Sequence, residues 1–237
     1  MMRIPPLFCV LAAFGLAVPA PHDAHAAGTV PIRPDLAGAG WQMLSFSGIP
    51  ETTFTASDDG VMDVTADRSS SVLYLKIADD PQPVRRLSWQ WRVADPLPAT
   101  DLSKTDGDDR MLSLYVAFSD GSLVSKAKAM MSPLAAGNVI NYVWGGTRAL
   151  DMPHPHFPDS GRLIVIRTAD APLGQWITES VDLAADYERA FGRPAPGVAY
   201  IGISGDADDL GRVSKASIRD IRFDCIEVRV ACAGNQP

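Results

Sequence analysis

Hydrophobic and polar residues alternate with a period of two over much of the chain, which is the pattern of half-buried β-strands. In LSWQWRV (87–93), Trp89 and Trp91 share the apolar side of the run and are expected in the core. Comparable runs, rich in β-branched and aromatic residues, predict strands at 111–118, 139–144, 162–169, 176–183 and 198–204. The runs GVMDVTA (60–66) and SVLYLKI (71–77) are close neighbours in the chain and predict a β-hairpin.

One further strand breaks the strict alternation. In SIRDIRF (217–223), Ile218 and Ile221 are three positions apart, so an unbroken strand would place them on opposite faces. A β-bulge near Arg219 and Asp220 would turn both isoleucines toward the core.

A single short helix is predicted at 182–192. Asp182 is a suitable N-cap, Gly192 a suitable end, and the apolar residues between them are four apart: Leu183, Tyr187 and Phe191. One short helix among so many strands predicts an all-β fold, an antiparallel β-sandwich of two packed sheets. No linker divides residues 27–237, so we expect a single β-sandwich domain.

Residues 1–26 have the features of a cleaved secretory signal peptide. Arg3 precedes an apolar run from Leu7 to Val18, and the small-residue motif Ala24-His25-Ala26 follows. The run is too short to span a bilayer, and no transmembrane segment is expected elsewhere. The sequence therefore predicts an exported protein, periplasmic or secreted.

Charge and cysteine content narrow the function classes. The net charge of −7 and the lack of any Lys/Arg run argue against nucleic acid or an anionic membrane as partner. Cys225 and Cys232 remain after the leader, and an even count in an exported chain favours a disulfide. No turn-forming residue lies between them in IEVRVA, which argues against a bridge, so the sequence does not decide between a Cys225–Cys232 disulfide and two free thiols.

Several segments occur in an order that resembles a known family. They are SWQWRV, DGDDRMLSLYVAF, NYVWG, RTADAPLGQWITESVDLAADYERAFG, GDADDLG and KASIRDIRF. Over residues 41–224 this set resembles an exported bacterial family catalogued as a domain of unknown function (DUF3047-like). The resemblance implies a jelly-roll sandwich similar to carbohydrate-binding and galactose-binding-like domains, but no activity. Relatives usually carry Asp-x-Asp-Asn-Thr in the last acidic motif, where this chain has Leu210 after its third aspartate.

Two acidic clusters, each beside a predicted strand, are the first candidate site. The first acidic cluster is Asp106, Asp108 and Asp109; the second is Asp206, Asp208 and Asp209. If the two strands are neighbours, Asp106, Asp108, Asp206 and Asp208 could supply carboxylate oxygens to Ca²⁺, the one cofactor that the sequence suggests. The alternative is that these aspartates only form turns, which they favour by bonding to their own backbone.

Aromatic residues give a second set of candidates. Trp144 leads into the long loop 145–161, and Trp176 begins a strand, so either could stack on a sugar ring. Packing in the core is the alternative for both. His154 and His156, flanked by Asp151 and Asp159, could form a weak metal site, but further ligands at known spacing are missing, and a solvated loop is the preferred interpretation.

The sequence thus favours a non-catalytic protein that binds a glycan or another cell-envelope ligand. Its binding residues would lie on loops 94–109 and 145–161 and on the turn 205–211. One alternative is a glycan hydrolase using Asp108, Asp209 and Glu179, although Glu179 is expected to face away from the apolar side of its strand. The other is a structural or protein-interaction module.

Overall fold

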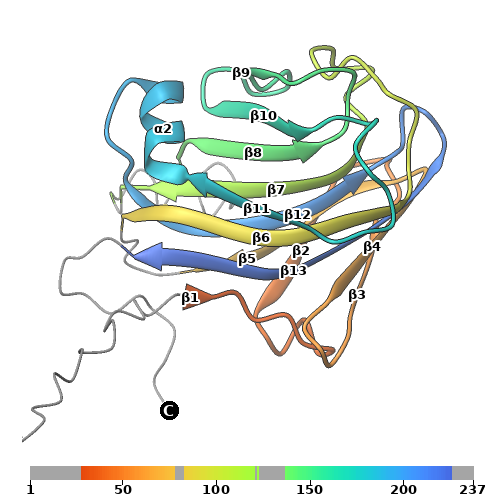
Figure 1. The fold of residues 1–237 in the computed structure, drawn as a ribbon, viewed down its shortest axis with the longest axis horizontal. Helices are drawn as coiled ribbons and strands as arrows, with labels where there is room; N and C mark the ends of the chain where they lie inside the picture. The colour runs from red at the N-terminus through yellow and green to blue at the C-terminus, as the bar shows by residue number, and fades with distance from the viewer. Residues whose placement is uncertain (1–27, 78–82, 121, 123–136, 226–237) are drawn as a thin grey trace, which may run out of the picture.

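Two β-sheets pack face to face, with one short helix at one end of the sandwich (Figure 1). The computed structural model describes residues 28–77, 83–120, 122 and 137–225. The first sheet contains β1 (Gly28–Thr29), β3 (Thr53–Ala56), β4 (Met62–Asp67), β6 (Val84–Asp95), β11 (Ile177–Asp182) and β13 (Val213–Cys225). The second contains β2 (Trp41–Ser45), β5 (Ser70–Lys76), β7 (Arg110–Ser119), β8 (Val139–Trp144), β9 (Asp151–Pro153), β10 (Gly161–Arg167) and β12 (Gly197–Asp206).

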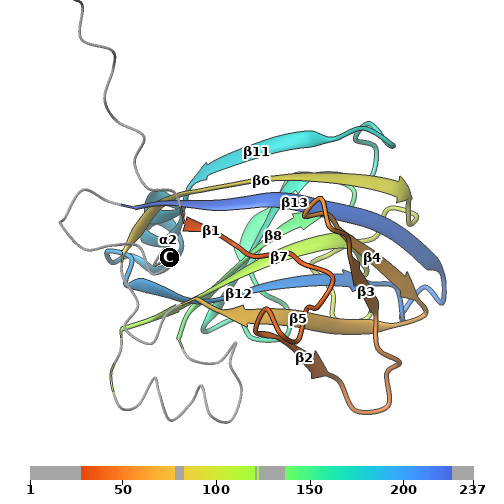
Figure 2. The same cartoon turned by 90° about the horizontal axis from the view of Figure 1, so that it is seen from below.

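The strand order shows a sandwich with crossovers between its layers. The first sheet has the order β11-β6-β13-β4-β3, with β1 also paired to β13; the second has the order β2-β5-β12-β7-β8-β10-β9. All neighbours pair antiparallel except β8 and β10, which are parallel. Figure 2 shows the two layers nearly edge-on, with β6 and β13 in one layer and β5 and β12 in the other. The all-β sandwich predicted from the alternating pattern is confirmed.

The predicted hairpin of β4 and β5 is wrong, because the two strands belong to different sheets. The connecting residues do not form a hairpin turn. Arg68 adopts a left-handed conformation (φ 51°), and its N–H donates to the carbonyl of Arg212, while the carbonyl of Ser69 accepts from Ala207. These bonds tie the connection to the turn after β12 and carry the chain from one layer to the other.

Aromatic rings from both sheets interlock in the core. Trp89 and Trp91 of β6 contact each other edge-to-face at 5.2 Å between ring centroids. Across the interface, Tyr142 of β8 lies 5.5 Å from Trp89, and Trp144 lies 5.5 Å from Trp91. All four side chains are almost fully buried, so the core position predicted for Trp89 and Trp91 is confirmed. Such contacts add to the free energy gained by removing the rings from water.

Helix α2 (Leu183–Phe191) has the predicted ends. The side chain of Asp182 accepts from the Ala185 N–H at 3.0 Å. At the other end Gly192 is left-handed (φ 67°), and its N–H donates to the carbonyl of Glu188 at 2.8 Å. The predicted bulge in β13 is also present: the register shifts between Arg219 and Arg222, and Asp220 has φ 53°.

The bulge has the predicted effect on the core. Ile218 and Ile221 are both fully buried, although an unbroken strand would have turned one of them outward. Residues 1–26 and Cys232 lie outside the described residues, so the signal peptide and the Cys225–Cys232 disulfide stay predictions. Among the described residues, no helix is long and apolar enough to cross a membrane.

Candidate functional site

The two acidic clusters meet at one buried arginine. Arg110 begins β7 and pairs in register with Asp206 at the end of β12. Its guanidinium Nη1 lies 2.7 Å from Asp108 Oδ2, and Nη2 lies 3.2 Å from Asp206 Oδ2. All three side chains are more than nine-tenths buried. The guanidinium therefore compensates one carboxylate from each cluster in an environment where an unpaired charge would be costly.

Asp109 fixes the turn that carries the second acidic cluster. Its Oδ1 accepts from the backbone N–H of Asp209 at 3.2 Å, and its Oδ2 accepts from that of Leu210 at 2.7 Å. Two bonds from successive N–H groups hold the turn against the start of β7. The juxtaposition on which the sequence-based site depended is thus confirmed.

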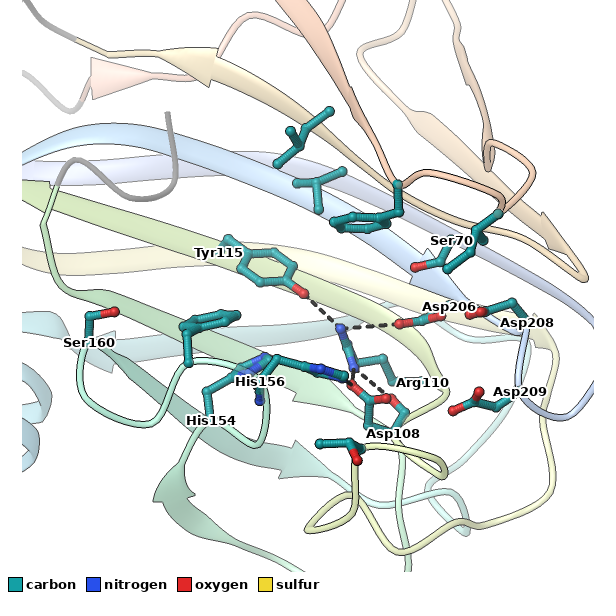
Figure 3. Close-up of a pocket in the computed structure, with 16 residues that line it drawn as sticks. Ser70, Asp108, Arg110, Tyr115, His154, His156, Ser160, Asp206, Asp208 and Asp209 are labelled. Carbon is teal, nitrogen blue, oxygen red and sulfur yellow. Dashed lines mark hydrogen bonds and ion pairs between the residues drawn. The ribbon is translucent and has the colours of Figure 1, made fainter. Parts of the chain in front are cut away.

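A cavity of about 540 Å³ lies over this meeting point, on the outer face of the second sheet (Figure 3). Alternate residues of β7 divide between the two faces: Leu114 and Val116 enter the sandwich core, and Tyr115 belongs to a separate cluster with Val72. The cavity is lined by Leu44, Phe46, Ile49, Ser70, Val72, Thr105, Asp108, Arg110, Tyr115, His154, His156, Phe157, Ser160, Asp206, Asp208 and Asp209. Apolar and aromatic groups thus share one cavity with four aspartates.

Tyr115 extends the polar network across the floor of the cavity. Its hydroxyl accepts a hydrogen bond from Arg110 Nη2 at 2.8 Å. The neighbouring strand position is Gly202, and a Cβ there would lie 2.8 Å from Val72 Cγ1 and 3.4 Å from Tyr115 Cβ. Glycine at this position therefore leaves room for the two side chains that form the floor.

Both histidines line the cavity, and the solvated-loop interpretation is wrong for His154, which is buried, whereas His156 is about half exposed. His154 is only 1% exposed, stacks on Phe157 with ring centroids 3.7 Å apart, and accepts from the His156 N–H at its Nδ1. His156 Nε2 lies 3.2 Å from Asp108 Oδ2. The predicted flanking ligand Asp151 instead binds Arg162 and Arg189.

Burial and charge move the pKa values of the cavity residues in different directions. Burial raises the pKa of Asp206 to about 8; the Arg110 guanidinium opposes this rise, and the carboxylates of Asp208 and Asp108 add to it. Burial would also raise the pKa of Asp108, but Arg110 and His156 lower it below its usual range. Burial, together with the nearby Arg110, lowers the pKa of His154 to about 3, so this ring is neutral at physiological pH.

The structure does not bring the predicted tryptophans to the site. Trp144 is fully buried between the sheets, because it shares the inward face of β8 with Tyr142. Trp176 directly precedes β11 of the first sheet, and the guanidinium groups of Arg92 and Arg219 lie over its ring at 4.8 and 4.2 Å from the centroid. Trp144 has no exposed surface, so its prediction as a ligand-binding residue is wrong. Trp176 is partly exposed but does not line this cavity, and its role in ligand binding stays a prediction.

Two predicted carboxylates also lie elsewhere. Asp106 is exposed and outside the cavity lining, whereas Asp108, Asp109, Asp206, Asp208 and Asp209 gather at the site. Glu179 points inward, against expectation, because it shares the parity of Ile177 and Val181 on β11. It accepts hydrogen bonds from Trp91 Nε1 at 2.9 Å and from Arg167 Nε at 2.6 Å, which make it a structural group away from the cavity.

Sequence reasoning missed Arg110, Tyr115 and Phe46. The parity of β7 offered a signal for Tyr115, which alternates with the apolar positions of MLSLYVAF. Arg110 directly follows two aspartates and precedes that apolar run, which marks a cation at the entry of a buried strand. Nothing local distinguishes Phe46, which follows β2 and reaches the cavity only through the pairing of β2 with β5.

Fold and site together define a β-sandwich protein with a cavity of mixed apolar and acidic lining on the outer face of one sheet. Residues 39–222 match the family described as protein of unknown function DUF3047, and the chain belongs to that family. The sequence matches no curated protein.

Among solved structures, similar folds include carbohydrate-associated domains. One is the family 11 carbohydrate-binding module of the cellulosomal cellulase Lic26A-Cel5E of Clostridium thermocellum (TM-score 0.41, 11% identity, 86% of this chain and 99% of that one). Another is the cellulose induced protein Cip1 (TM-score 0.43, 12% identity, 84% of this chain and 95% of that one). A third is the xyloglucanase domain of NopAA from Sinorhizobium fredii in complex with cellobiose (TM-score 0.42, 11% identity, 77% of this chain and 90% of that one).

Proposed function

We propose that this protein is exported to the periplasm or the medium and binds a carbohydrate, or another hydroxyl-rich cell-envelope ligand, in the cavity over the second sheet. The observation that carries the proposal is the pairing of apolar rings with buried carboxylates in one cavity of about 540 Å³. That volume is within the range of roughly 300–1,000 Å³ found for small-ligand sites.

The two kinds of lining match the two kinds of surface on a sugar. The rings of Phe46, Tyr115 and Phe157 offer apolar area to the C–H face of a pyranose. The carboxylates accept hydrogen bonds from its hydroxyls, and bonds to a charged acceptor are stronger than neutral ones. Both groups occur in the same cavity, which favours a ligand with alternating apolar and hydroxyl surface.

The carboxylates are held in place before any ligand arrives. Arg110 bonds Asp108 and Asp206 from its two terminal nitrogens, and Asp109 fixes the adjacent turn. Groups already ordered lose little conformational entropy on binding, which favours affinity. His156, with about half of its side chain exposed, stands at the Asp108 side of the cavity where an entering ligand can reach it.

Binding to a glycan array, followed by calorimetry on the best hits, tests this function. Phe46 is 40% exposed and lines the cavity, so Phe46→Ala should weaken binding about 10-fold through lost ring contact. Met43 is equally exposed (38%) on the neighbouring strand β2 but outside the lining, so Met43→Ala is the matched control and should keep wild-type affinity. An array without any hit, or equal affinity for both variants, would contradict the proposal.

Glycan hydrolysis is a second candidate, favoured by the split pKa values of two carboxylates on one arginine. The pKa of Asp206 is raised to about 8 and that of Asp108 is lowered, the pattern of a general acid beside an ionised partner. A panel of chromogenic glycosides separates the two functions. Turnover that disappears in Asp206→Asn would support hydrolysis, and binding without turnover supports the first proposal.

A further inference from the structure

We propose that Asp109, Asp206 and Asp208 form a binding site for one Ca²⁺ ion at the edge of the cavity. This site is independent of the glycan-binding proposal, because its evidence is a set of carboxylate oxygens and not the shape of the cavity. It also differs from the sequence-based set, which contained Asp106 and Asp108.

The three carboxylates come from two segments that the fold brings together. Asp109 precedes β7, Asp206 ends β12, and Asp208 lies in the turn that follows. Each offers an oxygen, and these oxygens lie within 4.8 Å of one another. Oxygens around a Ca²⁺ ion are 2.3–2.6 Å from the metal, so ligand atoms on opposite sides are separated by roughly 5 Å. The spacing therefore suits a shared ion.

A second, independent observation is the unpaired oxygen of Asp206. Its Oδ2 pairs with Arg110, but its Oδ1 is buried and has no hydrogen-bond donor. Asp206 is only 6% exposed, and buried polar oxygens are normally satisfied. As long as Oδ2 stays paired with Arg110, Oδ1 is the oxygen that Asp206 can contribute to the group with Asp109 and Asp208. A bound cation would give Oδ1 the partner that it lacks.

The charge balance of the cavity points the same way. Four aspartates line it, and Arg110 is the only lysine or arginine among the described lining residues. The terminal nitrogens of that arginine are already bonded to Asp108, Asp206 and Tyr115. Asp109 and Asp208 place carboxylate oxygens within 4.8 Å of each other, and like charges at that distance repel. A divalent ion would remove this repulsion.

The ligand chemistry selects the ion. All three groups are carboxylates, and hard oxygen ligands suit Ca²⁺, Mg²⁺ or Mn²⁺ and not the softer ions that prefer sulfur or imidazole. Ca²⁺ accepts irregular geometry and several carboxylates, whereas Mg²⁺ requires a near-ideal octahedron and keeps its waters. Asp109 already accepts two backbone N–H groups, so its oxygens are fixed in position and retain lone pairs for a metal.

Isothermal titration of the purified, metal-free full chain with CaCl₂ tests the site, with Tb³⁺ luminescence sensitised by nearby aromatic rings as a second readout. We expect one Ca²⁺ per chain with a dissociation constant of about 10⁻⁶–10⁻³ M, and weaker binding of Mg²⁺. Asp208→Asn should lower the affinity at least 10-fold. Asp106→Asn, an exposed aspartate outside the three-carboxylate group, is the matched control and should stay within about twofold of wild type.

Circular dichroism of both variants establishes that they are folded, since Asp208 is only half-buried and bonds no arginine in the described network. The proposal is overturned if no Ca²⁺ binds at about 10 mM, which is about tenfold above the weakest dissociation constants of extracellular sites (about 1 mM), or if Asp208→Asn binds as tightly as wild type. No sugar is present in these titrations, so a negative glycan array leaves their outcome unaffected.

Discussion

Arg110 and Asp206 face each other on adjacent antiparallel strands, with Nη2 of the arginine 3.2 Å from Oδ2 of the aspartate. Arg110 opens β7 and Asp206 closes β12, so this ion pair lies at the end of two central strands of the second sheet, where the two acidic clusters meet. The pair is buried, and it therefore decides whether the carboxylates of the cavity can stay ionised.

Removing the cation should strongly destabilise the fold. Arg110→Met would leave Asp108 and Asp206 buried without their partner, which should lower the free energy of unfolding by about 3–5 kcal/mol. Arg85→Ala, which breaks an exposed ion pair with Asp182, is the control and should cost less than about 1 kcal/mol. Urea denaturation measures both. Equal losses for the two variants would show that burial of the Arg110 network contributes nothing.

His154 should make stability sensitive to acid. Its pKa is about 3 in the folded state because of burial and the nearby Arg110, and about 6.5 when unfolded. Between these values the unfolded chain binds a proton that the folded ring does not, so this contribution to stability is complete above pH 6.5 and decreases as the pH falls toward 3.

His154→Gln should therefore flatten the acid limb of the stability curve. Burial, Arg110 and His156 all disfavour protonation of the His154 ring, and together they outweigh Asp108, which favours it. The measurement is urea unfolding at pH 4.5, 5.5 and 7, with the slope expected to change by up to about 1.4 kcal/mol per pH unit. His156→Gln, at an exposed ring, is the control; a slope unchanged in His154→Gln would contradict the assignment.

The bulge in β13 should tolerate glycine better than a β-branched residue. Asp220 has φ 53°, and the left-handed region costs roughly 1–2 kcal/mol for residues with a bulky Cβ. Asp220→Val should therefore lower the free energy of unfolding by about that amount, whereas Asp220→Gly should remain within about 1 kcal/mol of wild type. Thermal unfolding of both variants measures the difference, and a stable valine variant would mean that the bulge relocates.

Trp176 should matter for the first sheet and not for the cavity. Two guanidinium groups lie over its ring, and each such contact is worth about 0.5–1 kcal/mol at an exposed site. Trp176→Ala should lower stability by about 1–2 kcal/mol while glycan affinity in calorimetry stays at the wild-type value. Lost affinity at unchanged stability would restore Trp176 as a binding residue.

Local sequence patterns predicted those features that depend on neighbouring residues. Strands β4 to β8 and β10 to β13 follow from their apolar and alternating runs, the ends of α2 from Asp182 and Gly192, and the bulge from the spacing of Ile218 and Ile221. The short strands β1, β2, β3 and β9 were not predicted. The β4–β5 hairpin failed because partner choice depends on distant chain: the bonds that direct the crossing come from the turn after β12.

The site was predictable only in part for the same reason. The meeting of the two acidic clusters followed from assuming that their strands are neighbours, and β7 and β12 do pair. The histidines were assigned to a solvated loop because metal ligands at known spacing are missing, and the ion pair of His156 with Asp108 could not be foreseen from residues so far apart in the sequence. Trp144 was predicted to bind a ligand because a long loop follows it. The alternation of its strand, however, puts Trp144 on the same face as Tyr142, and both rings pack in the core.

The walls of the cavity come from β2 and the residues after it, from β5 and β7, from the segment after β9 and from the end of β12, stretches that come together only when the second sheet is complete. Whatever occupies it can bind only the finished molecule, so occupancy adds its own free energy to the resistance of the whole sandwich against heat and proteases. A chain cut between β7 and β12 should therefore lose retention on an affinity column even if each half remains soluble.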